Sequence, residues 1–279
     1  MLPCRHLAND RQCMYGVFPR NFRTGIVKVV SENQLQNVRL AMWSGPRNIS
    51  TAMMRAWENR ADTRVWDEPF YAYYLRATGL QHPMREEIIA AGETDWRRVV
   101  QQCAEDNPDG VRISYQKHMT HHMLPELEFD WFGRVQHCFL IRDPAYVVRS
   151  YLAKREAATL ADIGIEQQWR LFDQVCQQQG DAPLVIDSAD FLKRPEAYLR
   201  TVCTSIGVGF DERMLAWPAG PRDSDGAWAP HWYHAVWKST QFQAPTLEKE
   251  EEDLPHNHPV VLAAGPFYQK LKQHRLVLD

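Results

Sequence analysis

The sequence lacks several features that mark well-defined classes of protein. Its six cysteines include no Cys-x-x-Cys pair, so the spacing indicates neither a zinc ribbon nor a disulfide framework. No run approaches the ~20 apolar residues of a membrane-spanning helix, and the first thirty residues contain no uninterrupted apolar stretch of the kind found in secretory signals. We therefore expect a cytoplasmic protein with reduced thiols and no membrane partner.

The sequence also lacks an excess of positive charge. Its formal net charge is −3 and its isoelectric point is near 6.4, which argues against a nucleic-acid partner and favours a small anion as ligand. The composition is otherwise ordinary, because 44 % of the 279 residues are hydrophobic and 24 % are charged. A soluble chain of this kind buries a substantial core.

Strand-like and helix-like segments alternate along most of the chain. The predicted strands are 38–43, 63–68, 111–116, 133–142 and 182–188. The predicted helices are 50–59, a stretch through the seventies, 94–106, one from Pro144, 164–179 and 259–276. This alternation predicts an α/β fold, a three-layer doubly wound parallel sheet with an anion-binding turn of the P-loop type after the first strand.

Three segments divide the chain. Residues 1–37 have no clear hydrophobic period and are expected to form an N-terminal extension. Residues 38–245 are expected to form the α/β domain. Residues 246–279, which begin with the acidic run at 248–253, are expected to form a linker and a C-terminal helix packed on the domain.

The turn after the first predicted strand has the composition of an anion site. In "WSGPRNIST" (43–51), an apolar strand leads through Ser44-Gly45-Pro46 to Arg47 and then to hydroxyls in the first turn of a helix. Backbone N–H groups at a helix N-terminus attract anions, and ligands of doubly wound sheets bind at the carboxyl ends of strands. Taken alone, the hydroxyls would fit an ordinary helix cap equally well. The turn does not match the G-x-x-x-x-G-K-[ST] loop of nucleotide triphosphatases.

A second motif follows the strand that ends near residue 142. In "RDPAYVVRS" (142–150), Asp143 is a predicted N-cap and Pro144 the first residue of a helix. Ser150 then lies roughly 10 Å along that helix, at ~1.5 Å per residue, which is within reach of an Arg side chain from the strand end. Arg142 and Ser150 are therefore placed to hold one phosphate between them, unless Arg142 is simply an exposed charge.

Together the two motifs resemble those of the sulfotransferases that use 3′-phosphoadenosine 5′-phosphosulfate (PAPS). That family has a P-K/R-S-G-T-T/S loop for the 5′-phosphosulfate and a later R-x-P-x-x-x-x-x-S for the 3′-phosphate, where this chain has "PRNIST" (46–51) and "RDPAYVVRS". The resemblance implies that Arg47 lies near the bridging oxygen and that Arg142 and Ser150 bind the 3′-phosphate. It also implies a loop contact from Asn48 and 5′-phosphate contacts from Ser50 and Thr51. Asn48-Ile49 departs from the family's Ser-Gly.

The resemblance implies further site residues and a co-substrate. The segment "VWKSTQF" (236–242) is similar to the family's late W-K-x-x-F segment, which makes Lys238, Ser239 and Thr240 expected contacts of the nucleotide. The implied reaction moves a sulfuryl group from PAPS to a hydroxyl or amine of a small-molecule or carbohydrate acceptor. Arg and Lys supply the cations that such a transfer needs, so no metal is expected.

Two residues are candidates for the base that takes the acceptor's proton. Glu68 in "VWDEPFYAYY" (65–74) resembles an E-P element of several carbohydrate and bacterial sulfotransferases. His118 in "YQKHMTHHMLP" (115–125) resembles the His of the cytosolic H-x-P-x-x-L-L-P stretch. A histidine has an unperturbed pKa near ~6.5 and is the better base chemically, whereas a glutamate needs desolvation. Lys117 beside His118 is placed either to neutralise charge or to face water.

Several alternatives remain open at the level of sequence. Glu68 fits a helix-capping residue, His118 fits an interior histidine, and the cluster of His118, His121 and His122 fits a zinc site if the segment is helical. A P-loop phosphotransferase with an altered loop would require Mg²⁺ and ATP. A module that binds the nucleotide without turnover would keep the 3′-phosphate contacts alone.

Overall fold

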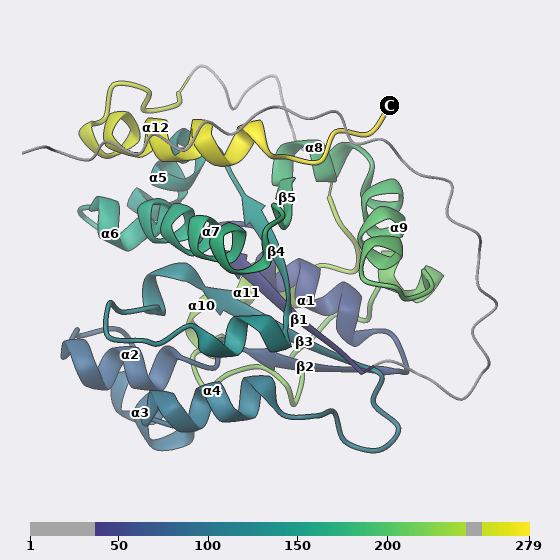
Figure 1. The fold of residues 1–279 in the computed structure, drawn as a ribbon. Coiled ribbons are helices and arrows are strands. Elements are labelled where there is room, and N and C mark those ends of the chain that lie inside the picture. The colour runs from purple at the N-terminus through teal and green to yellow at the C-terminus, as the bar shows by residue number, and fades with distance from the viewer. Residues whose placement is uncertain (1–36, 244–252) are drawn as a thin grey trace, which may run out of the picture. The chain divides into compact units, whose positions relative to one another are not determined.

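The computed structural model describes residues 37–243 and 253–279. Its strands are β1 (Val38–Ser44), β2 (Thr63–Asp67), β3 (Ile113–Met119), β4 (Gln136–Ile141) and β5 (Leu184–Asp187). They pair in parallel as one sheet in the order β2-β3-β1-β4-β5 (Figure 1). The predicted α/β fold with a doubly wound parallel sheet is confirmed.

Helices connect the strands and cover the sheet. The α-helices are α1 (Ser50–Glu58), α2 (Tyr71–Thr78), α3 (Arg85–Ala91), α4 (Trp96–Ala104), α5 (Pro144–Leu152), α6 (Leu160–Ile163), α7 (Ile165–Gln179), α8 (Ser188–Lys193), α9 (Pro195–Ser205), α10 (Ala229–Trp232), α11 (His234–Trp237) and α12 (Pro259–Gln273). The 3₁₀ helices are η1 (Thr120–His122), η2 (Asp130–Arg134) and η3 (Glu212–Leu215).

The central strand β1 shows why the fold has three layers. Its apolar side chains are buried on both faces of the sheet, as parallel strands covered by helices require. Leu40 and Met42 pack with α1, α8 and α9, whereas Ala41 and Trp43 pack with α4, α7 and α12. Successive side chains of a strand point to opposite faces, so one continuous apolar segment supplies both cores (Figure 1).

The candidate residues follow the carboxyl ends of β1, β2, β3 and β4. Because the strands are parallel, the loops that follow β1, β2, β3 and β4 all leave the sheet at one edge. Arg47 follows β1, Glu68 follows β2, η1 follows β3 and Arg142 follows β4. Residues that are distant in sequence are therefore brought to the same side of the domain, where ligands of this architecture bind.

Element boundaries differ from the predictions in informative places. The third strand runs to Met119 rather than ending at 116, and the fourth begins at Gln136 because residues 130–134 form η2. The short helix α3 and the pair α8 and α9 have no counterpart among the predicted elements. The extension of β3 matters most, because it places His118 inside a strand.

The end segments are described only in part. The expected N-terminal extension lies outside the described residues except for Asn37, and so does most of the expected acidic linker. The C-terminal helix α12 packs on the sheet and contributes Ala264, Tyr268 and Leu271 to the core that contains α7. In residues 37–243 and 253–279, no helix combines the length and the hydrophobicity needed to cross a bilayer.

Candidate active site

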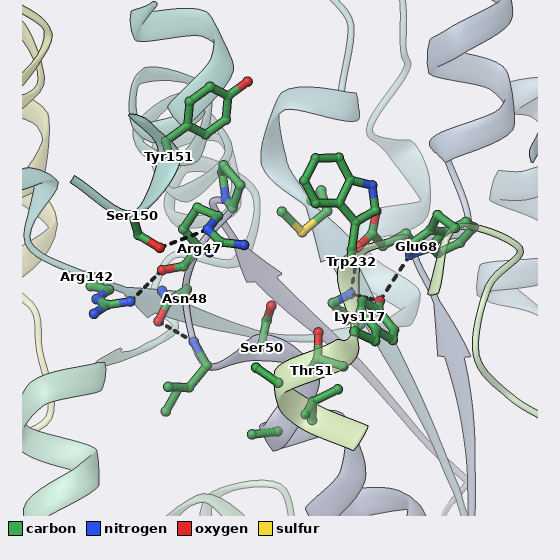
Figure 2. Close-up of a pocket in the computed structure, with 18 of the residues that line it drawn as sticks. Arg47, Asn48, Ser50, Thr51, Glu68, Lys117, Arg142, Ser150, Tyr151 and Trp232 are labelled. Carbon is green, nitrogen blue, oxygen red and sulfur yellow. Dashed lines mark hydrogen bonds and ion pairs between the residues drawn. The ribbon is translucent and has the colours of Figure 1, made fainter. Parts of the chain in front are cut away.

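A cavity of about 440 Å³ opens at the carboxyl edge of the sheet. Most of the residues predicted for the site line it, namely Arg47, Asn48, Ser50, Thr51, Glu68, Arg142, Ser150 and Ser239. In the view of Figure 2, Arg47, Asn48, Arg142 and Ser150 are grouped on one side of the cavity and Glu68 with Lys117 on the other. Ser50 and Thr51 lie between these two groups.

The loop after β1 is held in an uncommon conformation. Arg47 has a φ of 56°, in the left-handed region that non-glycine residues rarely adopt. Gly45 allows the loop to approach α6, since a Cβ there would lie 2.6 Å from the carbonyl oxygen of Ile163. Asn48 fixes the loop through two bonds, donating to the carbonyl of Leu140 at 3.1 Å and accepting from the backbone N–H of Ile49 at 2.8 Å.

This conformation explains the departure from the family's loop sequence. The Asn48 amide ties the loop to the end of β4, and the Ile49 side chain packs against the apolar cluster around α1. No side chain caps the N-terminus of α1, and its first turn contains no acidic residue. The first-turn N–H groups thus keep the positive end of the helix dipole available to an anion in the cavity.

The two sequence motifs meet through direct hydrogen bonds. The Nε of Arg47 donates to the hydroxyl of Ser150 at 2.9 Å, and an Nη of Arg142 donates to the carbonyl oxygen of Arg47 at 2.6 Å (Figure 2). Burial lowers the pKa of the Arg47 guanidinium, but a group with a usual value near 12.5 stays charged at neutral pH. Two cations and a hydroxyl are thereby gathered at one wall of the cavity.

On the opposite side, Lys117 forms the centre of a buried polar network. Its Nζ donates to Asp67 Oδ1 at 2.8 Å, to Glu68 Oε1 at 2.6 Å and to the Tyr233 hydroxyl at 2.6 Å. Tyr233 in turn donates to Asp67 Oδ2 at 2.7 Å. The register pairs Asp67 of β2 with Lys117 of β3, so the sheet itself positions the cation beside both carboxylates.

Electrostatics in this network adjust the acidity of Glu68. Burial raises the pKa of its carboxyl; Lys117 opposes the rise and Asp67 adds to it, and the balance sets the pKa at about 6. Burial alone would lower the pKa of Lys117, but the carboxylates of Asp67 and Glu68 outweigh burial and hold that pKa well above its usual value. Glu68 is therefore ionised at neutral pH and more basic than an exposed glutamate, which is the condition for a general base.

The structure places His118 in the core and not at the cavity. The side chain is 1 % exposed and stacks on Trp43 with ring centroids 4.4 Å apart. Burial lowers the pKa of His118 to about 3, with His137 as a second cause. The side-chain nitrogen of Gln116 donates to the carbonyl oxygen of Cys103. The side-chain oxygen of Gln116 therefore accepts from His118 Nε2, at 3.1 Å. The ring is buried and does not line the cavity, so it cannot reach an acceptor bound there.

The late segment contributes less to the cavity than expected. Lys238 and Thr240 are exposed and do not line it, whereas Ser239 does. The Ser239 hydroxyl accepts from Trp217 Nε1 at 3.2 Å and donates to the carbonyl of Val236 at 2.7 Å. Thr240 instead supplies its carbonyl oxygen to the backbone of Trp217. The side chains of Lys238 and Thr240 thus lie outside the cavity lining, and their nucleotide contacts stay predictions.

His118, His121 and His122 do not come together as a metal site. In the part of the chain that the structure describes, no three His, Cys, Asp or Glu side chains are grouped to hold a metal ion. His121 and His122 follow β3 in η1 and pack against tyrosines of α2. The alternative of a zinc cluster at His118, His121 and His122 fails because His118 points into the core.

Comparison with known proteins decides the family. A sequence model described as a sulfotransferase domain matches residues 38–275, which is most of the chain. The chain belongs to the sulfotransferase domain family. The matched span contains β1 to β5 and every residue of the cavity described above.

A solved sulfotransferase domain has a similar fold. The sulfotransferase domain of the Synechococcus PCC 7002 olefin synthase superposes with a TM-score of 0.55 at 16 % identity. The match covers 89 % of this chain and 98 % of that domain. At this identity the likeness shows the shared fold alone.

Curated relatives of this sulfotransferase domain protein come from Arabidopsis thaliana. "Branched-chain-amino-acid aminotransferase-like protein 1" is 34 % identical over 233 residues, and "Branched-chain-amino-acid aminotransferase-like protein 2" is 33 % identical over 232 residues. Each match covers 83 % of this chain but 41 % of the relative. The chain therefore spans about two fifths of the length of these relatives.

The sulfotransferase cavity includes residues that sequence patterns did not single out. Asp67 completes the network around Lys117, and Arg155 and His82 also line the cavity. Asp67 was detectable in principle, because an acid at the last position of a buried strand needs a partner. Nothing in the local sequence marks Arg155 or His82, which lie in connections between helices.

Proposed function

We propose that the protein transfers the sulfuryl group of PAPS to a hydroxyl or amine of a small-molecule or carbohydrate acceptor. The observation that carries the proposal is the direct contact between the two motifs, through Arg47, Ser150 and Arg142, at one wall of one cavity. A ligand with anionic groups at both ends of an adenosine fits two anion-binding groups that share a cavity. A triphosphate loop would not require Arg142 and Ser150.

The residues of this wall fit the two charged ends of the nucleotide. Arg142 and Ser150 would hold the 3′-phosphate. Ser50, Thr51 and the N-terminus of α1 would hold the 5′-phosphate, and Arg47 would lie at the bridging oxygen. When bound, PAPS supplies the sulfuryl group and leaves as adenosine 3′,5′-bisphosphate.

Glu68 is the proposed base. Its carboxylate, held by Lys117, accepts the proton of the acceptor hydroxyl or amine as the new bond to sulfur forms. Arg47 stabilises the negative charge that develops on the leaving phosphate oxygen. The positive charges of Arg47 and Arg142 supply this stabilisation from side chains, and no step requires a metal.

The relatives are named as aminotransferase-like, but we do not propose amino transfer for this chain. A pyridoxal-dependent enzyme needs a lysine amine that forms a Schiff base with the cofactor. The two lysines that line the cavity are Lys117 and Lys154. Lys117 is surrounded by two carboxylates and a hydroxyl that hold it as an ammonium ion, and Lys154 is exposed, so neither has the setting of such an amine.

Transfer of labelled sulfate tests the proposal. Purified protein is incubated with ³⁵S-labelled PAPS and an acceptor library of phenols, alcohols, amines and sugars, without added metal and with a chelator. We expect labelled product from at least one acceptor class, with loss of product in Arg47→Ala and in Glu68→Gln. Phosphate transfer from ATP with Mg²⁺ would instead support an altered phosphotransferase, and binding of the bisphosphate without any transfer would indicate a module without turnover.

A further inference from the structure

The cavity has a second wall that the nucleotide motifs do not use. We call it the acceptor wall, and it consists of Tyr71 and Tyr74 of α2, His82, His121 and His122, Lys154 and Arg155, and Trp232 of α10. These residues come from five segments, namely α2, the connection after α2, η1, the segment after α5, and α10. The following inference rests on the proposed function and concerns which acceptors this wall selects.

The aromatic part of the acceptor wall is a layered stack. The His122 ring stacks with the rings of both Tyr71 and Tyr74, at centroid distances of 4.5 Å and 4.8 Å. The Tyr71 hydroxyl also forms a hydrogen bond of 2.9 Å with His82 Nδ1. Burial lowers the pKa values of His82, His121 and His122, so these rings are neutral at physiological pH. The stack is therefore uncharged and largely buried, with Tyr71, Tyr74 and His122 5 %, 9 % and 1 % exposed, and it contributes uncharged lining to the cavity.

Beside these uncharged rings the acceptor wall carries two cations, Lys154 and Arg155, of which Arg155 is the more buried. The Arg155 guanidinium lies over the Trp232 ring with its carbon 5.6 Å from the ring centroid, and the side chain is half-buried. No carboxylate among the described residues forms an ion pair with it. Besides Glu68, the acid Asp162 also lines the cavity, and its Oδ2 accepts from the backbone N–H and the hydroxyl of Thr159 at 2.8 Å and 2.7 Å. Burial is the main cause of the lowered pKa of His82; the charge of Arg155 lowers that pKa further, and Asp162 opposes the change.

A half-buried guanidinium that has no ion-pair partner among the described residues can take its counter-charge from an anionic ligand. Lys154 adjoins Arg155 on the cavity lining and carries the same sign, so the two residues make this end of the wall positive. A guanidinium stacked on an aromatic ring keeps its N–H edges free for a planar anion, and its fork matches a carboxylate or a phosphate in two-point contact.

We propose that the physiological acceptor is itself an anion. It carries a carboxylate or phosphate group that Arg155 binds with help from Lys154, and a flat apolar body that lies against Tyr71, Tyr74 and Trp232. Its nucleophilic hydroxyl or amine then faces Glu68. Arg155 is a specificity-determining residue for the acceptor and takes no part in binding the nucleotide.

A matched series of phenols tests this inference by binding, without requiring turnover. Calorimetry on protein saturated with adenosine 3′,5′-bisphosphate compares 3-(4-hydroxyphenyl)propanoate with its methyl ester, with 4-(2-aminoethyl)phenol and with (4-hydroxybenzyl)phosphonate. We expect at least one acid to bind about tenfold or more tightly than the ester, and the amine to bind least, since one charge-assisted contact commonly changes affinity by about that factor. The carboxylate and phosphonate arms show which anion the wall prefers.

Variants assign the preference to Arg155. In Arg155→Met, which keeps an apolar side chain over Trp232, the acid-to-ester ratio should fall to about one, and Arg155→Lys should restore part of it. Arg170→Ala, an exposed arginine of α7, removes the same charge elsewhere and should leave the ratio unchanged. The bisphosphate affinity of Arg155→Met should stay within about twofold of wild type.

The outcomes separate this inference from the proposed function. Failure of wild type to bind the bisphosphate would reject the proposed function, whatever the acceptors do. If the bisphosphate binds but the acids bind no more tightly than the ester and the amine, the acceptor is not selected by charge and the inference is wrong. The same conclusion holds if none of the four phenols binds. A loss of bisphosphate affinity in Arg155→Met with an unchanged acid-to-ester ratio would assign Arg155 to the nucleotide and overturn the inference.

Discussion

Arg47 donates a hydrogen bond of 2.9 Å to Ser150, a residue 103 positions later in the chain. This contact joins the loop after β1 to the helix after β4, and Arg142 reinforces it by donating to the Arg47 carbonyl. The parallel sheet makes the contact possible, because β1 and β4 are neighbours and end at the same edge. The two sequence motifs thereby meet at one cavity.

Arg47→Ala should reduce turnover far more than nucleotide binding. Its proposed role is at the breaking bond, so we expect kcat to fall by about 10²–10³, the range found when a transition-state donor is removed. The Kd for adenosine 3′,5′-bisphosphate should rise by less than about tenfold. Steady-state kinetics and calorimetry measure the two quantities, with Arg170→Ala as the matched control. An unchanged kcat with a large rise in Kd would assign Arg47 to ground-state binding.

Activity should rise with pH through the ionisation of Glu68. Burial raises its pKa to about 6, and a general base must be ionised, so kcat/KM should increase from pH 5 to a plateau above pH 7 with a midpoint of about 6. Glu68→Gln should lose about 10²–10⁴-fold of the rate together with the acidic limb. If the pH profile of Glu68→Gln kept an acidic limb with the wild-type midpoint, another group would be the base.

Lys117→Met should move the acidic limb to higher pH. Lys117 lowers the pKa of Glu68 against the larger effect of burial, so its removal should raise that pKa and shift the midpoint upwards. The variant also leaves two adjacent buried carboxylates without their cation, and we expect a loss of about 3–5 kcal/mol in the free energy of unfolding. The exposed Lys193→Met serves as control, and its midpoint should match wild type. If the midpoint of the acidic limb in Lys117→Met equalled that of wild type, Lys117 would not set the pKa of the base.

The layers of the fold were readable from sequence for a physical reason. Strands buried on both faces, such as β1, consist of continuous apolar residues, and the helices between them have apolar faces of helical period. Helices α8 and α9 were not predicted, because α8 follows β5 directly and a single arginine separates the two. Local patterns therefore located the sheet better than its later connections.

Site residues could be predicted where a motif fixes their spacing along the chain. They could not be predicted where their position depends on the length of a strand. The separation of Arg142 and Ser150 fixes their relative positions along one strand end and one helix, and the structure brings both to the cavity. The position of His118 depends on where β3 ends, and three further residues of strand bury it beside Trp43. Arg155 reaches the cavity only through the packing of α10 against the segment after α5, which no local pattern shows.

His118→Gln should affect stability more than catalysis. Glutamine preserves a donor toward Gln116, but the stacking on Trp43 is lost, so we expect a destabilisation of about 1–3 kcal/mol and a kcat/KM within about threefold of wild type. The pKa of His118 is lowered by burial to about 3, so the unfolded chain binds more protons than the folded one below pH ~6.5. Wild-type melting temperature should therefore fall as pH drops from 7 to 5, and less steeply in the variant. A large loss of kcat with an unchanged acidic limb would restore His118 as a catalytic candidate.

The most direct test of the account is calorimetric titration with adenosine 3′,5′-bisphosphate and with adenosine 5′-phosphate, on wild type and on Arg142→Ala. The central claim is that Arg142 and Ser150 read the 3′-phosphate in the same cavity that holds the 5′ end. We predict that wild type binds the bisphosphate at least about tenfold more tightly than the monophosphate, and that Arg142→Ala removes this difference. Equal affinities of wild type for the two nucleotides would contradict the account.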